Sequence, residues 1–238
     1  MVAQALADRS SQEPVVSETT LKIILAGVLS YWGTIALTYP VTNYDSQVYN
    51  LARLLIAAKS GFWQTSSWNS VRQVMFPWAY DAVHFPFLAL GYGFALPSFA
   101  CLLGTLATIY CLVSSGWGQS AALWSCLTVV AMPTIVLQAT ATKNDLAVVF
   151  ALGCWLYACD RYNRTRKRVY VFFKALSLAF AVGSKTSALP LCAACTLITL
   201  YLLRREARAL LFLSAAYVPL LCLFGSVETY ALSYRCFH

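Results

Sequence analysis

The chain has 238 residues, of which 60% are hydrophobic, 14% aromatic and only 11% charged. A soluble domain carries roughly 25% charged residues. Here the deficit falls in long blocks that approach the ~20 apolar residues needed to cross a bilayer. The composition excludes a soluble globular protein and predicts a single all-α, polytopic integral membrane domain.

Seven spans are predicted in a membrane module over residues 21–228. The mostly polar residues 1–20 are not typical of a signal peptide, and we expect them to form a disordered cytoplasmic tail. Residues 229–238 form a short C-terminal tail, and residues 115–119 are too few for anything but a turn. The expected spans are 22–39, 95–114, 120–138, 145–160, 169–184, 187–203 and 209–226.

The first loop, residues 40–94, is the only long connection between the predicted spans. Within it, Ser46–Ala58 has the apolar spacing of an amphipathic helix, and Asp45 or Ser46 can cap its N-terminus. One face of this helix is expected to carry Val48, Leu51 and Leu55, and the opposite face Gln47, Asn50 and Arg53.

A second stretch in this loop, Trp78–Leu90, is apolar but is interrupted by Pro86 and contains Asp81 and His84. It is too short and too polar to cross alone, so we expect a juxtamembrane helix at the membrane interface. A crossing here would also move every later loop to the other side of the membrane.

The net charge of +8 is concentrated in two short basic runs, Arg161–Arg168 and Arg204–Arg208. Basic clusters beside spans mark cytoplasmic loops. The runs follow the fourth and sixth predicted spans, so a cytoplasmic N-terminus places both in the cytoplasm. We therefore expect them to orient the protein, and we expect no nucleic-acid partner.

Cysteines are frequent, but they do not indicate a disulfide framework. Eight of the nine lie in or at the ends of apolar blocks, where cysteine acts as a small hydrophobic residue. Cys192 and Cys195 form a C-x-x-C within an apolar helix, and a redox or metal role for this pair is disfavoured. With only two histidines in the chain, no metal ligands are assigned.

Ionisable side chains gather on the predicted outer face, where charge beside a bilayer is costly and indicates function. Three of these side chains have an ordinary explanation: Asp45 is a helix cap, Asp145 lies at a favourable helix N-terminus and Lys185 is an interfacial lysine. These three residues, however, come from three separate loops. The full set comprises Asp45, Arg53, Lys59, Arg72, Asp81, Lys143, Asp145, Lys185 and Glu228.

This combination suits a sugar donor whose phosphate lies at the interface and whose lipid tail lies in the bilayer. A lysine or arginine would neutralise the phosphate leaving group. A carboxylate would take the proton of an acceptor hydroxyl, a transfer worth about 10²–10⁴-fold in rate.

Four segments, in this order relative to the spans, resemble the GT-C superfamily of membrane glycosyltransferases. The similarity is to bacterial members akin to protein O-mannosyltransferases and lipid A aminoarabinose transferases, and it covers about residues 20–226. The segments are Thr42–Arg53 after the first span, Val71–Gln73 followed by Pro77, Leu137–Asp145, and Gly183–Thr186 after the fifth span.

The resemblance implies inverting transfer of a sugar from a polyprenyl-phosphate-type donor to an acceptor on the periplasmic side of a bacterial inner membrane. Asp45 would be the catalytic base, and Lys185, Arg53 and Arg72 would contact the donor phosphate. Asp145 would be the second acidic, positioning residue. The remaining implied site residues are Lys143 and Asn144 beside Asp145, and Tyr44, Tyr49, Gln73 and Asp81 near the sugar.

Two other functions are compatible with the sequence. Most relatives continue well beyond seven spans, so the chain could be a truncated, non-catalytic scaffold or assembly protein, or could need a partner subunit. A small-solute transporter is less favoured, because it should carry ionisable residues near mid-span.

The implied partners are the bilayer, the lipid-linked donor and an acceptor glycan, lipid or protein. No cofactor is assigned, and use of a divalent metal stays open because branches of the family differ.

Overall fold

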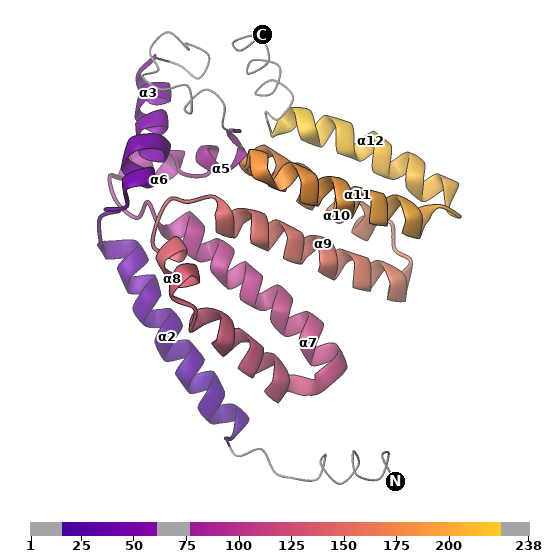
Figure 1. Cartoon of the computed structure of the whole chain (residues 1–238), viewed down its shortest axis with the longest axis horizontal. Coiled ribbons are helices and arrows are strands. Elements are labelled where there is room, and N and C mark those ends of the chain that lie inside the picture. The colour runs from indigo at the N-terminus through magenta and orange to yellow at the C-terminus, as the bar shows by residue number, and fades with distance from the viewer. Residues whose placement is uncertain (1–15, 61–76, 225–238) are drawn as a thin grey trace.

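Long apolar helices dominate the computed structural model, which describes residues 16–60 and 77–224 (Figure 1). Every regular element in these ranges is helical. The long helices are α2 (Glu18–Thr38), α7 (Leu96–Val130), α9 (Asp145–Thr165), α10 (Val169–Ser184), α11 (Leu189–Leu203) and α12 (Ala207–Leu223). The short elements are η1 (Ser46–Leu51), α3 (Ala52–Ser60), α5 (Ala79–Ala82), α6 (Phe85–Leu90), α8 (Pro133–Ala139) and η3 (Thr186–Ala188).

Three of the described helical stretches are long and apolar enough to cross a membrane. They are α2, α7 and the stretch Thr186–Leu203, which joins η3 to α11. α10 and α12 are apolar but shorter. The all-helical prediction is confirmed for the described residues, and these three helices support a membrane protein.

A turn inside α7 lies where residues 115–119 were expected to form one. Gly118 has φ of 86° and ψ of 171°, a conformation that is essentially restricted to glycine. The two arms of α7, residues 96–117 and 119–130, therefore lie side by side in opposite directions (Figure 1). The Cys126 thiol donates to the Leu106 carbonyl oxygen between them at 3.5 Å.

The helix predicted over 120–138 is divided in two, which corrects that expectation. The second arm of α7 ends at Val130, and α8 begins at Pro133. Proline disfavours a helical conformation in the residue before it, and Met132 is extended, with φ of −77° and ψ of 114°. α9, in contrast, continues to Thr165, beyond the predicted end of its span at residue 160.

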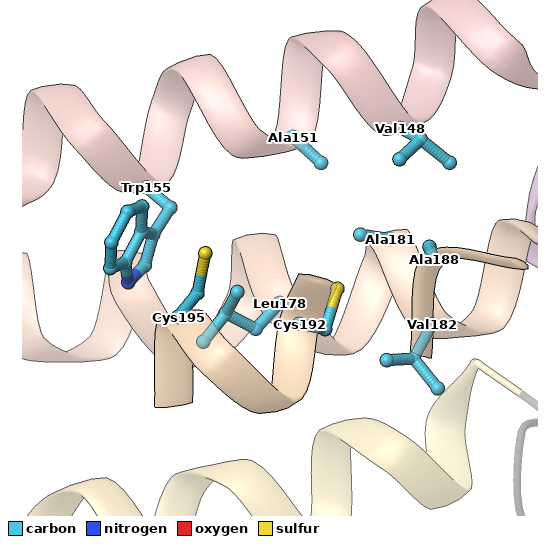
Figure 2. Close-up of a cluster of buried hydrophobic side chains, with 9 residues drawn as sticks. All are labelled: Val148, Ala151, Trp155, Leu178, Ala181, Val182, Ala188, Cys192 and Cys195. Carbon is cyan, nitrogen blue, oxygen red and sulfur yellow. The ribbon is translucent and has the colours of Figure 1, made fainter. Parts of the chain in front are cut away.

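α9 and α10 form the centre of the packing. α9 packs against α7 and α10, and α10 also packs against α12. Gly104 permits the close approach of α7 to α9, because a Cβ at this position would lie 2.4 Å from the Phe150 ring. Figure 2 shows one buried cluster between α9, α10 and α11, formed by Val148, Ala151, Trp155, Leu178, Ala181, Val182, Ala188, Cys192 and Cys195.

The cysteines behave as small hydrophobic residues in this packing. Cys192 and Cys195 point from α11 toward α9 and α10 in the buried cluster of Figure 2. Both are free thiols, as are the other cysteines in the part of the chain that the structure describes.

The amphipathic helix expected over Ser46–Ala58 is helical, but its predicted faces are wrong. Arg53 is buried, whereas Leu55 is exposed. η1 is a π-helix, whose wider turns shift all following residues around the helix axis relative to a 3.6-residue period. The face of α3 that packs inward is therefore not the one that the apolar spacing indicated.

The stretch Trp78–Leu90 also differs from the single interfacial helix that we expected. It forms two short helices, α5 and α6, with His84 immediately before α6. α5 packs against α10, and its residues Ala79, Tyr80 and Asp81 are buried. α5 therefore belongs to the protein core, whereas no residue of α6 is buried.

Candidate functional site

A polar pocket of about 290 Å³ lies where the first loop meets the N-terminus of α9 and the C-terminus of α10. Residues of η1, of the connection between α8 and α9, and of the end of α10 form its walls. Its lining consists of Asp45, Tyr49, Asn50, Lys143, Asn144, Asp145 and Lys185.

Asp45 enters this pocket with its carboxylate free of any capping role, contrary to the expected cap. The cap is provided by Asn43, whose Oδ1 accepts from the backbone N–H of Asp45 at 3.0 Å and of Ser46 at 3.4 Å. Asp45 is itself helical, and its side chain makes no capping hydrogen bond. The local fold thus directs a half-exposed carboxylate toward the pocket.

Two ion pairs occupy the pocket. Lys143 Nζ lies 2.8 Å from Oδ2 of Asp45, and Lys185 Nζ contacts Oδ1 of Asp145. The pocket therefore contains two ammonium groups and two carboxylates, with no formal net charge. Such a set can bind an anion through the lysines and accept a proton at a carboxylate.

The connection between α8 and α9 is held in place through its backbone. The Asn50 side chain donates to the Thr142 carbonyl oxygen at 2.6 Å, and the Thr142 N–H donates to Ser46 Oγ at 3.2 Å. Asn144 Nδ2 donates to the Ser184 carbonyl oxygen at the end of α10. These bonds join the three segments that supply the ionisable groups.

The two tyrosines expected near the sugar lie in different surroundings. Tyr49 lines the pocket. Tyr44 is exposed, and its ring meets the Tyr49 ring edge to face, with 6.4 Å between ring centroids. Tyr44 therefore lies beside the pocket and contacts it through Tyr49.

Arg53 and Asp81 form a buried pair that is separate from the pocket lining. Arg53 Nη1 lies 2.7 Å from Asp81 Oδ2, and the Arg53 guanidinium lies 4.1 Å from the centroid of the Trp78 ring. Burial raises the pKa of Asp81 to about 6, although the neighbouring Arg53 opposes the shift. Neither residue has the exposure that the expected contact with donor phosphate or sugar requires.

Two further predicted site residues, Arg72 and Gln73, lie outside the described residues. Within the described residues, no group of three or more His, Cys, Asp or Glu side chains is arranged to hold a metal ion.

The roles of Asn43 and Asn50 were not predicted from the sequence. An asparagine directly before a helix is a strong capping signal, so Asn43 could have been identified from Thr42–Asn43–Tyr44–Asp45. Asn50 was assigned only to a polar helix face. Its bond to Thr142 depends on the fold and has no signal in the sequence.

The basic runs meet at the other end of α9. Arg166 Nη1 lies 2.9 Å from Glu206 Oε1, and the Tyr162 hydroxyl donates to the same carboxylate. α9 begins at Asp145 in the pocket and ends at Thr165 in the first basic run. The pocket and the basic runs therefore lie at opposite ends of one helix of 21 residues, about 30 Å long at 1.5 Å per residue.

No protein-family model, curated protein or solved structure matches this chain.

Proposed function

We propose that the chain is a membrane glycosyltransferase of GT-C type. It would transfer a sugar from a polyprenyl-phosphate-type donor to an acceptor on the periplasmic face of a bacterial inner membrane, by inverting displacement. The observation that carries this proposal is the pocket itself. Two carboxylates and two ammonium groups from distant segments share one cavity at one end of the apolar helices.

The proposed topology has seven spans and a cytoplasmic N-terminus. It is supported by α9, which places the pocket at Asp145 and the first basic run, which begins at Arg161, at opposite ends of one helix. Basic clusters favour the cytoplasmic side. The pocket and the first loop then face the periplasm.

In the proposed reaction, Asp45 accepts the proton of the acceptor hydroxyl. The acceptor oxygen forms a bond to the anomeric carbon as the bond from that carbon to the phosphate oxygen breaks. The polyprenyl phosphate leaves with the electron pair of the broken bond. Lys143, 2.8 Å from Asp45, orients the carboxylate between acceptor and donor.

Lys185 is the proposed phosphate contact. It lies at the C-terminal end of α10, where an ammonium group can meet a phosphate at the headgroup level. Positive charge placed where negative charge develops lowers the barrier for departure of the phosphate. Asp145 would hold Lys185 in position before the donor binds.

A non-catalytic assembly protein is the second candidate, and one observation favours it. Each pocket carboxylate is already paired with a lysine, so the pocket is neutral without any ligand. A transporter receives less support. Lys174, the buried cation of α10, lies 4.5 Å from the Tyr162 ring centroid, within two turns of the end of α10 that follows the first basic run.

The test is sugar transfer by the purified protein in lipid nanodiscs supplied with a set of polyprenyl-phosphate sugars. Asp45→Asn should lower the rate by about 10²–10⁴-fold, because the base is lost. Asp160→Asn is the matched control, since Asp160 pairs with Arg164 near the opposite end of α9. Equal rates for wild type and Asp45→Asn would contradict the proposal. No turnover with any donor would favour the assembly protein.

A further inference from the structure

A chain of buried hydroxyl groups leads from the first loop to the pocket. The Ser98 hydroxyl, at the start of α7, donates to the Lys143 carbonyl oxygen at 3.4 Å. The Tyr80 hydroxyl of α5 is hydrogen-bonded to Ser98 Oγ. When the single Ser98 proton is directed to the Lys143 carbonyl oxygen, Tyr80 is the donor to Ser98. Both hydroxyl-bearing residues are buried.

The residue after Tyr80 ties the same short helix to the other side of the pocket. Asp81 forms the buried ion pair with Arg53. Arg53 lies in α3, which continues directly from η1, and η1 begins immediately after Asp45. α5 thus joins the segment that carries Asp45 to the segment that carries Lys143.

These contacts close a circuit. It runs from Asp45 along η1 to Arg53, across to Asp81 and Tyr80, through Ser98 to the Lys143 backbone, and back through the Lys143–Asp45 ion pair. Two of its links are ion pairs, Arg53–Asp81 and Lys143–Asp45, and two are hydrogen bonds, Tyr80–Ser98 and Ser98–Lys143.

We propose that Tyr80, with the Arg53–Asp81 pair behind it, is a positioning residue that holds Lys143 against Asp45. Its relevance to sugar transfer rests on the proposed function. A buried polar chain of this kind is costly to leave half satisfied, so it specifies one arrangement of the groups that it joins. The Lys185–Asp145 pair stands outside the circuit, because it links the start of α9 directly to the end of α10.

This difference provides an internal reference for an experiment that needs no catalytic activity. A water-soluble carbodiimide converts a lysine–carboxylate ion pair into an amide, with loss of water, and mass spectrometry of linked peptides measures the yield. In the full-length protein in nanodiscs, both Lys143–Asp45 and Lys185–Asp145 links should form. Tyr80→Phe should lower the ratio of the first link to the second by about two- to tenfold, the effect of one lost hydrogen bond.

Two further variants keep the result decisive. Ser98→Ala breaks the same chain with a smaller change of volume, and its ratio should fall in the same way. Tyr201→Phe, on the exposed side of α11, removes a hydroxyl outside the circuit and should leave the ratio unchanged. A retained Lys185–Asp145 link shows in each sample that the fold is intact.

An unchanged ratio in both Tyr80→Phe and Ser98→Ala would overturn the positioning role, whether or not the wild type transfers sugar. A lower ratio supports the role, even if no donor is turned over and the proposed function fails. If transfer is observed, Tyr80→Phe should also lower kcat with an unchanged KM, because the donor-binding Lys185 is not displaced.

Discussion

Lys143 Nζ lies 2.8 Å from the Asp45 carboxylate, although one residue follows α8 and the other precedes η1. Asn43 caps the helix in place of Asp45, which leaves the Asp45 carboxylate free to pair with Lys143. The contact also depends on the Thr142 backbone, which is bonded to Ser46 and Asn50. An ion pair between distant segments, held by this many independent bonds, is the basis of the function that we propose.

Removal of the Lys185 charge tests the phosphate contact. Lys185→Gln should lower kcat for sugar transfer by about 10²-fold, because one group that stabilises the leaving phosphate is lost. Lys185→Arg keeps the charge and should retain part of the rate. Lys167→Gln, in the basic run, is the control and should match the wild type. Initial rates in nanodiscs provide the measurement, and equal rates for Lys185→Gln and wild type would exclude the phosphate role.

Loss of the helix cap tests how the fold places Asp45. Asn43→Ala removes the acceptor for two backbone N–H groups and should cost about 1 kcal/mol of stability. It should also lower the transfer rate, because Asp45 is no longer held at the pocket. Asn43→Ser keeps a capping oxygen and should stay near the wild type in both respects. Thermal unfolding in detergent measures the stability of the two variants, and initial rates measure their sugar transfer. Equal stabilities and equal rates for Asn43→Ala and Asn43→Ser would contradict the capping role of Asn43.

Gly118 offers a stability test that is independent of function. A side chain here would meet no neighbour within 4 Å, but the backbone lies in a region essentially restricted to glycine. Gly118→Ala should therefore destabilise the protein by about 1–3 kcal/mol through backbone strain alone. Gly116→Ala is the matched control, because Gly116 is equally open, lies two residues away and has no positive φ. The Tm should fall for Gly118→Ala only, and a fall in both variants would count against the turn.

His84 should make stability depend on pH. It is buried beside Tyr80 and Asp81, and burial lowers its pKa from 6.5 to about 4. The unfolded chain therefore binds more protons than the folded one between about pH 4 and 6.5, so the contribution of His84 is complete above pH 6.5 and is lost toward pH 4. The difference between the two pKa values corresponds to at most roughly 3 kcal/mol in the free energy of unfolding.

The comparison is with His84→Asn, which can still donate to the Tyr80 carbonyl oxygen but does not titrate. The stability of the wild type relative to this variant should rise as the pH increases from about 4 to 6.5. Asp81 is present in both proteins, so its opposite trend largely cancels. Tm values at several pH values would measure the difference, and a constant difference would contradict the buried, neutral state of His84.

The helices were predictable because their apolar blocks are long and uninterrupted. The turn at Gly118 was also predictable, since residues 115–119 contain two glycines between two apolar blocks. The break before Pro133 has a signal in the sequence, but the apolar residues on both sides concealed it. The orientation of α3 was not predictable, because the π-helical η1 alters a periodicity that the sequence displays unchanged.

Six of the seven residues that line the pocket were named as candidates from the sequence. One is Tyr49, as a sugar contact. The other five are charged or amide residues: Asp45, Lys143, Asn144, Asp145 and Lys185. Arg53 and Asp81 were expected among the ionisable groups of the outer face that contact the donor. Their burial follows from the packing of α5 against α10, a long-range contact that no local pattern indicates.

The proposed function requires most directly that the pocket and the basic runs face opposite sides of the membrane. Labelling of sealed vesicles with a membrane-impermeant amine reagent, followed by peptide mass spectrometry, tests this. We expect Lys143 and Lys185 to be labelled from the outer side and Lys167 only after permeabilisation. Labelling of Lys185 and Lys167 from the same side of intact vesicles would contradict the proposed topology and with it the proposed function.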